Sequence, residues 1–276
     1  MTLIITSLSD NVVTQVSDRK LTYQDGSVGS DKAMKAVCIF CADAKFSIAY
    51  TGLARVGTTQ TAPRTDRWLV DYLTISRAAE KRFPEIIDGL RSHAANTFSR
   101  LRVLGKRRGI TFVFGGVGTP GIFAGFLSNQ EDAIGRWLTE LNDAFDGGWF
   151  FRNHRTMRKL DLMIHGAEKT ITPEIKAAIA KIRRQCFNRS AGKQVDVFVD
   201  VLRRASRNRT HGHLIGRDCM STTITWRGFS TNYHPESADS LSYIPHYVGP
   251  ELTARDAWIA TDEEAAERGR DAWQDQ

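Results

Sequence analysis

The chain opens with MTLIITSLSDNVVTQVSD, residues 1–18, and this stretch decides the fold. Apolar residues at 3–5 and 12–16, on either side of a polar turn, predict two short strands joined as a hairpin. A small residue after the initiator methionine predicts that Met1 is removed and that the mature chain starts at Thr2. Thr2 would then carry a nucleophilic hydroxyl and a free α-amine with a reference pKa of about 7.7–8.0, close to working pH. One residue would supply both halves of a nucleophile–base pair.

Two charged residues follow at positions from which they can reach Thr2. Asp18 stands sixteen positions after it, across the predicted hairpin. Lys35 stands at the start of an aliphatic run over 36–40, where its ammonium group can keep the hydroxyl ionisable and pair with Asp18. Lys32 is placed almost as well and remains an alternative to Lys35.

This pattern resembles the proteasome β-subunit branch of the N-terminal nucleophile hydrolases. In that family an N-terminal threonine is followed by a hydrophobic hairpin, an Asp–Arg turn, a lysine beside an aliphatic strand, and a turn made of a small residue and glycine. The resemblance covers residues 2–53. It implies Thr2 as the nucleophile, Asp18 as the hairpin acid and Lys35 as the strand lysine. It also implies that the backbone N–H of Gly52 stabilises the oxyanion.

Later in the chain the resemblance is partial. Asp218 and Ser221, ahead of a late predicted strand, match the spacing of the family's second acid and serine, which flank the terminal amine. The family's Gly-Ser-Gly turn has no counterpart after the strand predicted over 160–164. Its support of the nucleophile is therefore either absent or replaced by His165 or Glu168.

The remaining periodicities predict a chain of mixed secondary structure. The predicted strands are 36–40, 45–51, 110–116, 121–127, 160–164 and 222–226. The predicted helices are 65–73, 83–101, 131–145, 173–182, 195–206 and 251–276. This order fits two sheets packed face to face between helical layers. The resemblance makes the expectation more specific: an α+β fold built as a four-layer αββα sandwich of two antiparallel sheets.

Length and composition favour one soluble globular domain. The chain has 276 residues and shows no internal repeat or clear linker. We expect a single domain over 1–250, with an insertion at 130–158 where the order of elements departs from a standard proteasome subunit. Residues 251–276 are expected to form an acidic surface helix. No apolar stretch reaches the length of a membrane span, and residues 1–16 lack the basic start of a signal peptide, so a cytoplasmic protein is expected.

The net charge of +7 is unevenly distributed. Residues 251–276 hold eight acidic and three basic side chains, a net charge of −5, which leaves +12 for the rest of the chain. Basic clusters at 106–108, 183–184 and 203–209 are candidates for binding nucleic acid. They lack interleaved aromatic residues and a nucleic-acid motif. Solvated helix ends are therefore the favoured interpretation, and a nucleic-acid partner is not expected.

Cysteine and histidine patterns give two candidate metal sites. Cys38 and Cys41 are spaced like half of a zinc site, but positions three apart on a strand face opposite sides of the sheet. His211 and His213 can chelate a metal but have no evident companion ligand. We expect buried thiols, no disulfide framework, and no metal or cofactor.

The expected function is that of a threonine-type hydrolase that cleaves peptide or amide bonds through an acyl-enzyme on Thr2. Its partners would be a peptide or small amide substrate and further copies of the chain in a homo-oligomer, which the resemblance extends to a closed ring. The alternative is a non-catalytic scaffold or binding subunit of the same fold, which the missing Gly-Ser-Gly turn favours. Retention of Met1 would also favour it, because the Thr2 nitrogen would then be an amide without basicity.

Overall fold

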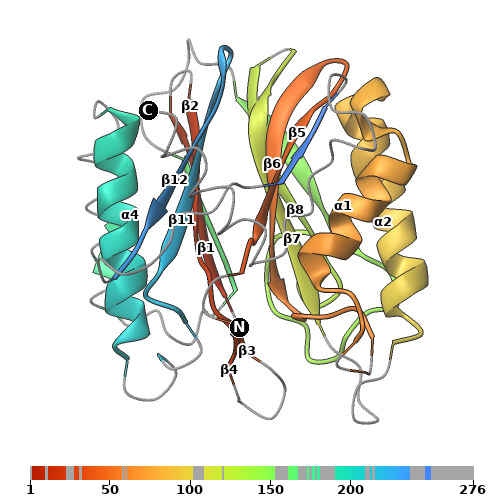
Figure 1. Ribbon diagram of the computed structural model, residues 1–276, viewed down its shortest axis with the longest axis horizontal. Helices are drawn as coiled ribbons and strands as arrows, with labels where there is room; N and C mark the ends of the chain where they lie inside the picture. Colours follow the sequence, from red (N-terminus) through yellow and green to blue (C-terminus); the bar gives the residue numbers. More distant parts are fainter. Residues whose placement is uncertain are drawn as a thin grey trace, which may run out of the picture.

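Two β-sheets lie face to face at the centre of the molecule, and helices cover the outer side of each sheet (Figure 1). The computed structural model describes residues 2–249 apart from 10–11, 23–27, 31–32, 58, 60, 102–108, 120, 153–160, 167–172, 174–175, 178, 181–189, 209–211, 213–214 and 237–245. Within these residues the protein has a mixed α+β structure, as predicted.

The five-stranded sheet has the order β10-β1-β2-β11-β12, and every neighbouring pair in it is antiparallel. Its strands are β1 Leu3–Ser9, β2 Val12–Asp18, β10 Asp161–Gly166, β11 Cys219–Thr225 and β12 Gly228–His234. The predicted N-terminal hairpin is formed by β1 and β2. Every residue of β1 is buried, because one face of the strand meets the second sheet and the other meets a helix.

The six-stranded sheet has the order β13-β5-β6-β7-β8-β9. Its strands are β5 Ala36–Phe40, β6 Ala44–Gly52, β7 Ile110–Gly118, β8 Gly121–Ser128, β9 Asp146–Arg152 and β13 His246–Val248. β13 runs parallel to β5, so the expectation of two purely antiparallel sheets is wrong at this edge. β3 Leu21–Thr22 and β4 Val28–Ser30 form a separate two-stranded ladder.

Helices of the described residues cover both sheets, so the molecule reads helix, sheet, sheet, helices across Figure 1. They are α1 Thr65–Ile75, η1 Ala78–Glu80, α2 Phe83–Phe98 and α4 Ala191–Ser206. α1 and α2 pack on the six-stranded sheet through an aromatic cluster, in which the Phe83 and Phe123 ring centroids are 4.1 Å apart. α4 packs on the five-stranded sheet through Phe198 and aliphatic neighbours. The predicted helices at 65–73, 83–101 and 195–206 are confirmed, with α2 ending at Phe98.

A mainly apolar layer with a polar centre fills the space between the sheets. Ile4 and Val113 pack in it from opposite sheets. Near the middle of the layer, the Gln15 side chain donates to Thr6 Oγ1 at 3.1 Å and accepts from Ser47 Oγ at 2.9 Å. These buried amide and hydroxyl groups satisfy one another, and they join the two sheets without using a charge.

Residues 131–145 do not form the predicted helix but a series of turns. The Asp132 carboxylate accepts from the N–H groups of Ile134 and Arg136 at 3.0 and 2.8 Å, so the side chain competes with helical backbone bonding. Gly135 adopts a φ of +79°, which is outside the helical region. Ile134 is 69% exposed, so the apolar periodicity of this segment does not mark a buried helix face.

Several predicted segments coincide only in part with what the structure describes. Of the predicted insertion at 130–158, residues 146–152 form β9 and complete the six-stranded sheet. Of the predicted helix at 173–182, half of the residues are described, and those are helical. The predicted helix at 251–276 and the basic clusters at 106–108 and 183–184 lie outside the described residues. In the described part of the chain, no helix combines the length and the apolar character that a membrane crossing requires.

Candidate active site

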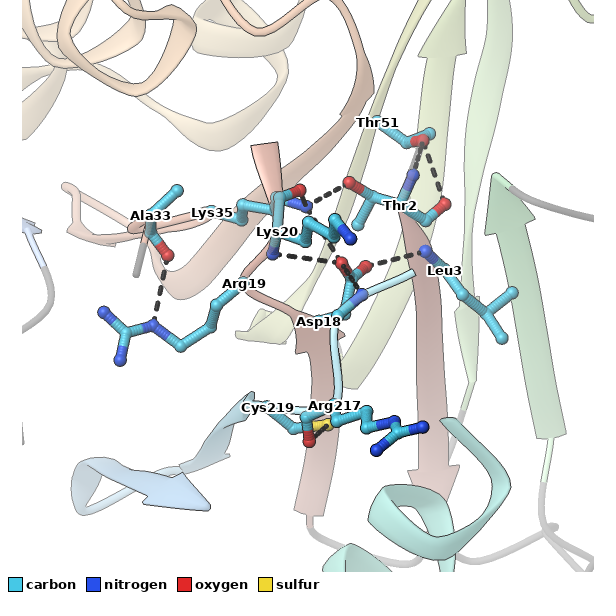
Figure 2. A network of polar contacts seen from close by, with 11 residues as sticks. Thr2, Leu3, Asp18, Arg19, Lys20, Ala33, Lys35, Thr51, Arg217 and Cys219 are labelled. Carbon is cyan, nitrogen blue, oxygen red and sulfur yellow. Dashed lines mark hydrogen bonds and ion pairs between the residues drawn. The ribbon is translucent and has the colours of Figure 1, made fainter. Parts of the chain in front are cut away.

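Thr2 lies immediately before β1 and is 4% exposed. Its backbone N–H donates to the Thr51 hydroxyl at 3.2 Å, and that hydroxyl donates to the Thr2 carbonyl at 3.0 Å (Figure 2). Thr51 belongs to β6, in the opposite sheet. The start of the chain is therefore anchored across the sandwich by one side chain that contacts both polar groups of the Thr2 backbone.

Asp18, the last residue of β2, is fully buried, and both of its carboxylate oxygens are hydrogen-bonded. Oδ1 accepts from the N–H of Leu3 at 3.0 Å. Oδ2 accepts from the N–H groups of Lys20 and Gly216 at 3.1 and 3.0 Å, and from Lys35 Nζ at 3.2 Å. Because these bonds come from four parts of the chain, Asp18 holds the start of β1 and the lysine in one fixed relation.

Lys35 completes the cluster from the segment just before β5. Its Nζ donates to Thr2 Oγ1, to the Lys20 carbonyl and to Asp18 Oδ2, as Figure 2 shows. Three acceptors match the three N–H donors of an ammonium group. The structure thus brings Thr2, Asp18 and Lys35 together as the sequence predicts, whereas Lys32, the alternative lysine, lies outside the described residues.

Burial decides the ionisation of this lysine. Removal from water lowers the pKa of Lys35 below its usual value, and the charge and hydrogen bond of Asp18 oppose that shift. Lys35 therefore loses its proton at a lower pH than an exposed lysine does. While it is protonated, it places a positive charge on the Thr2 hydroxyl, which favours the developing alkoxide.

Two glycines with positive φ lie at the ends of strands near the cluster, and one of them, Gly166, approaches Thr2 closely. Gly52 ends β6 directly after Thr51, and its φ of +115° favours glycine. Gly166 ends β10 with a φ of +105° and pairs with Leu3, and a Cβ added to it would lie 1.7 Å from the Thr2 carbonyl oxygen. Only glycine fits at position 166, and the predicted oxyanion donor at Gly52 lies one residue along the strand from the hydroxyl that anchors Thr2.

Asp218 and Ser221 take other partners, and neither is hydrogen-bonded to Thr2 in the described residues. The Asp218 carboxylate accepts from the Tyr233 hydroxyl at 2.7 Å. Ser221 Oγ lies 2.8 Å from His234 Nε2. The predicted loop is shorter than expected, because β11 starts at Cys219, three residues before the predicted start, and takes Ser221 into the sheet.

The strand period explains where Ser221 points. Alternate residues of β11 face opposite sides: Cys219 packs toward α4, and Met220 packs between the sheets. Ser221 has the same parity as Cys219. It therefore faces α4 and not the inter-sheet layer, which argues against the expectation that Ser221 flanks the terminal amine.

Sequence reasoning missed two residues near Thr2. Thr51 was expected only as part of the glycine turn, although small and polar residues at alternate positions of β6 indicate an inward face on which a hydroxyl can bond. Glu131 was expected on a helix, but its Oε2 lies 2.8 Å from Nδ1 of His165, one of the two candidates for replacing the missing turn. Glu168, the other candidate, lies outside the described residues.

No group of three or more histidine, cysteine, aspartate or glutamate side chains is placed to hold a metal in the described residues. His211 and His213 lie outside them. Burial raises the pKa of the Cys38 thiol to about 12 and that of the Cys41 thiol to about 11. Both thiols therefore stay protonated at neutral pH, which makes them weak nucleophiles.

Two comparisons with known proteins identify no family for this chain. No protein-family model matches the chain, and a search of curated proteins finds no match either. Function is therefore inferred from the chemistry of the residues around Thr2.

Proposed function

We propose that this protein is a threonine-type N-terminal nucleophile hydrolase that cleaves peptide or amide bonds. The observation that carries the proposal is the contact of Lys35 Nζ with Thr2 Oγ1, made while Asp18 holds both the lysine and the start of β1. A buried lysine on the hydroxyl of the second residue of a chain is an arrangement that activates a nucleophile. The activity requires removal of Met1, which converts the Thr2 nitrogen into a free amine.

The reaction proceeds in two steps. Thr2 Oγ attacks the substrate carbonyl carbon, and the Oγ proton passes to the Thr2 α-amine. The carbon–nitrogen bond of the substrate then breaks, the leaving amine takes that proton, and an ester joins the acyl group to Thr2. Water, deprotonated by the same amine, hydrolyses the ester and releases the acid. Lys35 stabilises the charge on Oγ, and the Gly52 N–H stabilises the oxyanion, a contribution of roughly 2.7–4 kcal/mol per donor.

The test is intact mass before and after incubation of the purified protein with a β-lactone, with the adduct mapped by peptide sequencing. Loss of Met1 and one adduct on Thr2 are the expected result. Thr2→Ala should remain unlabelled, and Thr2→Ser should be labelled because it keeps the hydroxyl. Labelling of Thr2→Ala at wild-type extent would overturn the proposal.

The second candidate is a non-catalytic scaffold or binding subunit. The different partners of Asp218 and Ser221 favour it, because the family's second acid and serine are then not at the amine. A purified protein that retains Met1, or that has a free Thr2 and stays unlabelled, would support this candidate. Copurification of a different partner chain would support this candidate further.

We further propose a homo-oligomer in the cytoplasm that acts on a peptide or small amide. The assembly and the substrate class follow from the family resemblance over residues 2–53. Light scattering coupled to gel filtration tests the assembly: a single species of several copies is expected, and a monomer at all concentrations would contradict it.

A further inference from the structure

A buried carboxylate–imidazole pair joins the two sheets beside Thr2. Glu131, which follows β8 closely, is 1% exposed, and His165 in β10 is 5% exposed. Glu131 Oε2 and His165 Nδ1 are 2.8 Å apart. Since β8 and β10 belong to different sheets, the pair connects the six-stranded sheet to the five-stranded one.

The carboxylate is held at both oxygens. The Thr111 hydroxyl donates to Glu131 Oε1 at 2.8 Å, while Oε2 meets His165. The Glu131 N–H donates to Ser128 Oγ at 3.0 Å, and that hydroxyl lies 2.8 Å from the hydroxyl of Thr111. With its backbone and both oxygens fixed, the Glu131 side chain has one orientation.

Each end of this network is next to a residue that contacts Thr2. Thr111 is directly opposite Thr51 in the β6–β7 ladder, and Thr51 bonds to both polar groups of the Thr2 backbone. At the other end, His165 immediately precedes Gly166, whose Cα hydrogen faces the Thr2 carbonyl where no larger group fits. A shift at either end therefore moves a direct neighbour of Thr2.

A second tie between the sheets shows that ionisable groups are not needed for that structural task. The Gln15, Ser47 and Thr6 side chains join the sheets through neutral hydrogen bonds alone. A buried carboxylate and imidazole cost more to desolvate than an amide and hydroxyls. The Glu131–His165 pair, which is ionisable, lies at the end of the sandwich where Thr2 lies.

We propose that Glu131 and His165 form a positioning pair for Thr2 that replaces the Gly-Ser-Gly turn of the resembled family. The inference rests on the proposed function. Other titratable groups beside Thr2 in the described residues are Asp18 and Lys35, with Cys219 close enough to interact with both electrostatically.

The experiment compares His165→Ala, His165→Asn and the control Ser47→Ala in the mature protein. The rate of β-lactone adduct formation on Thr2 is followed by intact mass from pH 6 to pH 10, together with urea unfolding. His165→Ala is expected to slow labelling by about 10- to 100-fold, the size of effect that follows from misplacement of a reacting group. It should also move the midpoint of the pH–rate curve by at least about 0.5 pH units, because a neighbouring charge is left without its partner.

The other two variants separate positioning from stability. The side-chain amide of His165→Asn can donate to Glu131, so most of the labelling rate should return. Ser47→Ala should lower the unfolding midpoint without slowing labelling or moving the pH midpoint. A His165→Ala protein with the wild-type rate and midpoint overturns the proposal, as does a Ser47→Ala protein that is slowed equally.

Two further measurements cover a failed fold and a failed function. If His165→Ala does not fold, Glu131→Gln, which keeps both contacts with an amide, is compared with Glu131→Ala, which removes them. Equal labelling rates in these two variants overturn the proposal. If the wild-type protein is never labelled, the proposed hydrolase fails, and hydrogen exchange of the peptide spanning residues 2–8 tests the positioning separately. Faster exchange in His165→Ala than in Ser47→Ala is expected; equal exchange overturns it.

Discussion

The Thr2 cluster and the Ser221–His234 pair both place a hydroxyl beside an ionisable side chain, yet they differ in where the hydroxyl lies along its strand. Thr2 precedes the first paired residue of β1. Ser221 lies inside β11 with β2 on one side and β12 on the other. Thr2 is therefore not enclosed by strand pairing on both sides, and its backbone bonds instead to the Thr51 side chain. Ser221 is enclosed by two neighbouring strands, so its hydrogen bond to His234 links β11 to β12 within the sheet.

The largest difference is expected from removing each hydroxyl in turn. Thr2→Ala should abolish β-lactone labelling, because the nucleophile is gone. Ser221→Ala should leave the labelling rate within about twofold and cost about 0.5–1.5 kcal/mol of unfolding free energy, the contribution of one ordinary hydrogen bond. Labelling rates and urea unfolding measure the two effects. Equal loss of labelling in both variants would show that the two hydroxyls belong to one site.

Removing the cation of the Thr2 cluster should have the next largest effect. Lys35→Met leaves the Asp18 carboxylate buried without its partner, and breaking a buried pair in this way costs about 3–5 kcal/mol. The double variant with Asp18→Asn should recover part of that loss, which urea unfolding can measure. Asp218→Asn, at a half-buried carboxylate, is the matched control, with an expected loss of no more than about 1.5 kcal/mol. A Lys35→Met protein as stable as this control would contradict a charged pair.

Two glycine-to-alanine substitutions test the close approach of Gly166 to the Thr2 carbonyl. Gly166→Ala forces a side chain into a left-handed φ and against that oxygen, so we expect a loss of at least about 1–3 kcal/mol and much slower labelling. Gly192→Ala, in the first turn of α4 with open space around it, should instead stabilise the protein by about 0.4–1 kcal/mol. Thermal unfolding of both variants gives the two signs, and the same sign in both would refute the assigned geometry.

The smallest expected effect is in the shape of the pH–rate curve. Labelling should rise with pH as the Thr2 amine loses its proton, near its reference pKa of about 7.7–8.0. It should fall again at higher pH, because the pKa of Lys35 lies below the usual 10.5 and the deprotonated lysine no longer stabilises the charge on Oγ. In Lys35→Arg the guanidinium stays protonated, so the alkaline decline should disappear even if the rate is lower. A decline at the same pH in Lys35→Arg would exclude Lys35 as its cause.

The Thr2 cluster could be predicted because Thr2, Asp18 and Lys35 match the pattern of the resembled family, although Lys35 stands 33 positions after Thr2. Asp18 reaches Thr2 across a single hairpin, and Lys35 comes from the segment just before the next long strand. The Glu131–His165 contact spans a similar distance of 34 residues, but no motif of the sequence marks these two residues as partners.

The incorrect predictions have local physical causes. The apolar spacing over 131–145 was compatible with a helix, but the Asp132 side chain and the left-handed Gly135 direct the chain into turns. The early start of β11 shifted Ser221 from a loop into the sheet, and its strand position then set which way it faces. In the first segment two residues outweighed the apolar periodicity, and in the second the strand began three residues before its predicted start.

The position of β1 between β2 and β10 has a consequence for the order of events during synthesis. β2 follows β1 at once, but β10 consists of residues 161–166. At about 5–20 residues per second, translation leaves an interval of roughly 10–30 s before β10 exists. During that time β1 has an open edge, and an aminopeptidase can reach the first residues of the nascent chain. Once β10 pairs, residues 3–8 gain their second neighbouring strand, so the rate of translation limits how long this edge of β1 stays open.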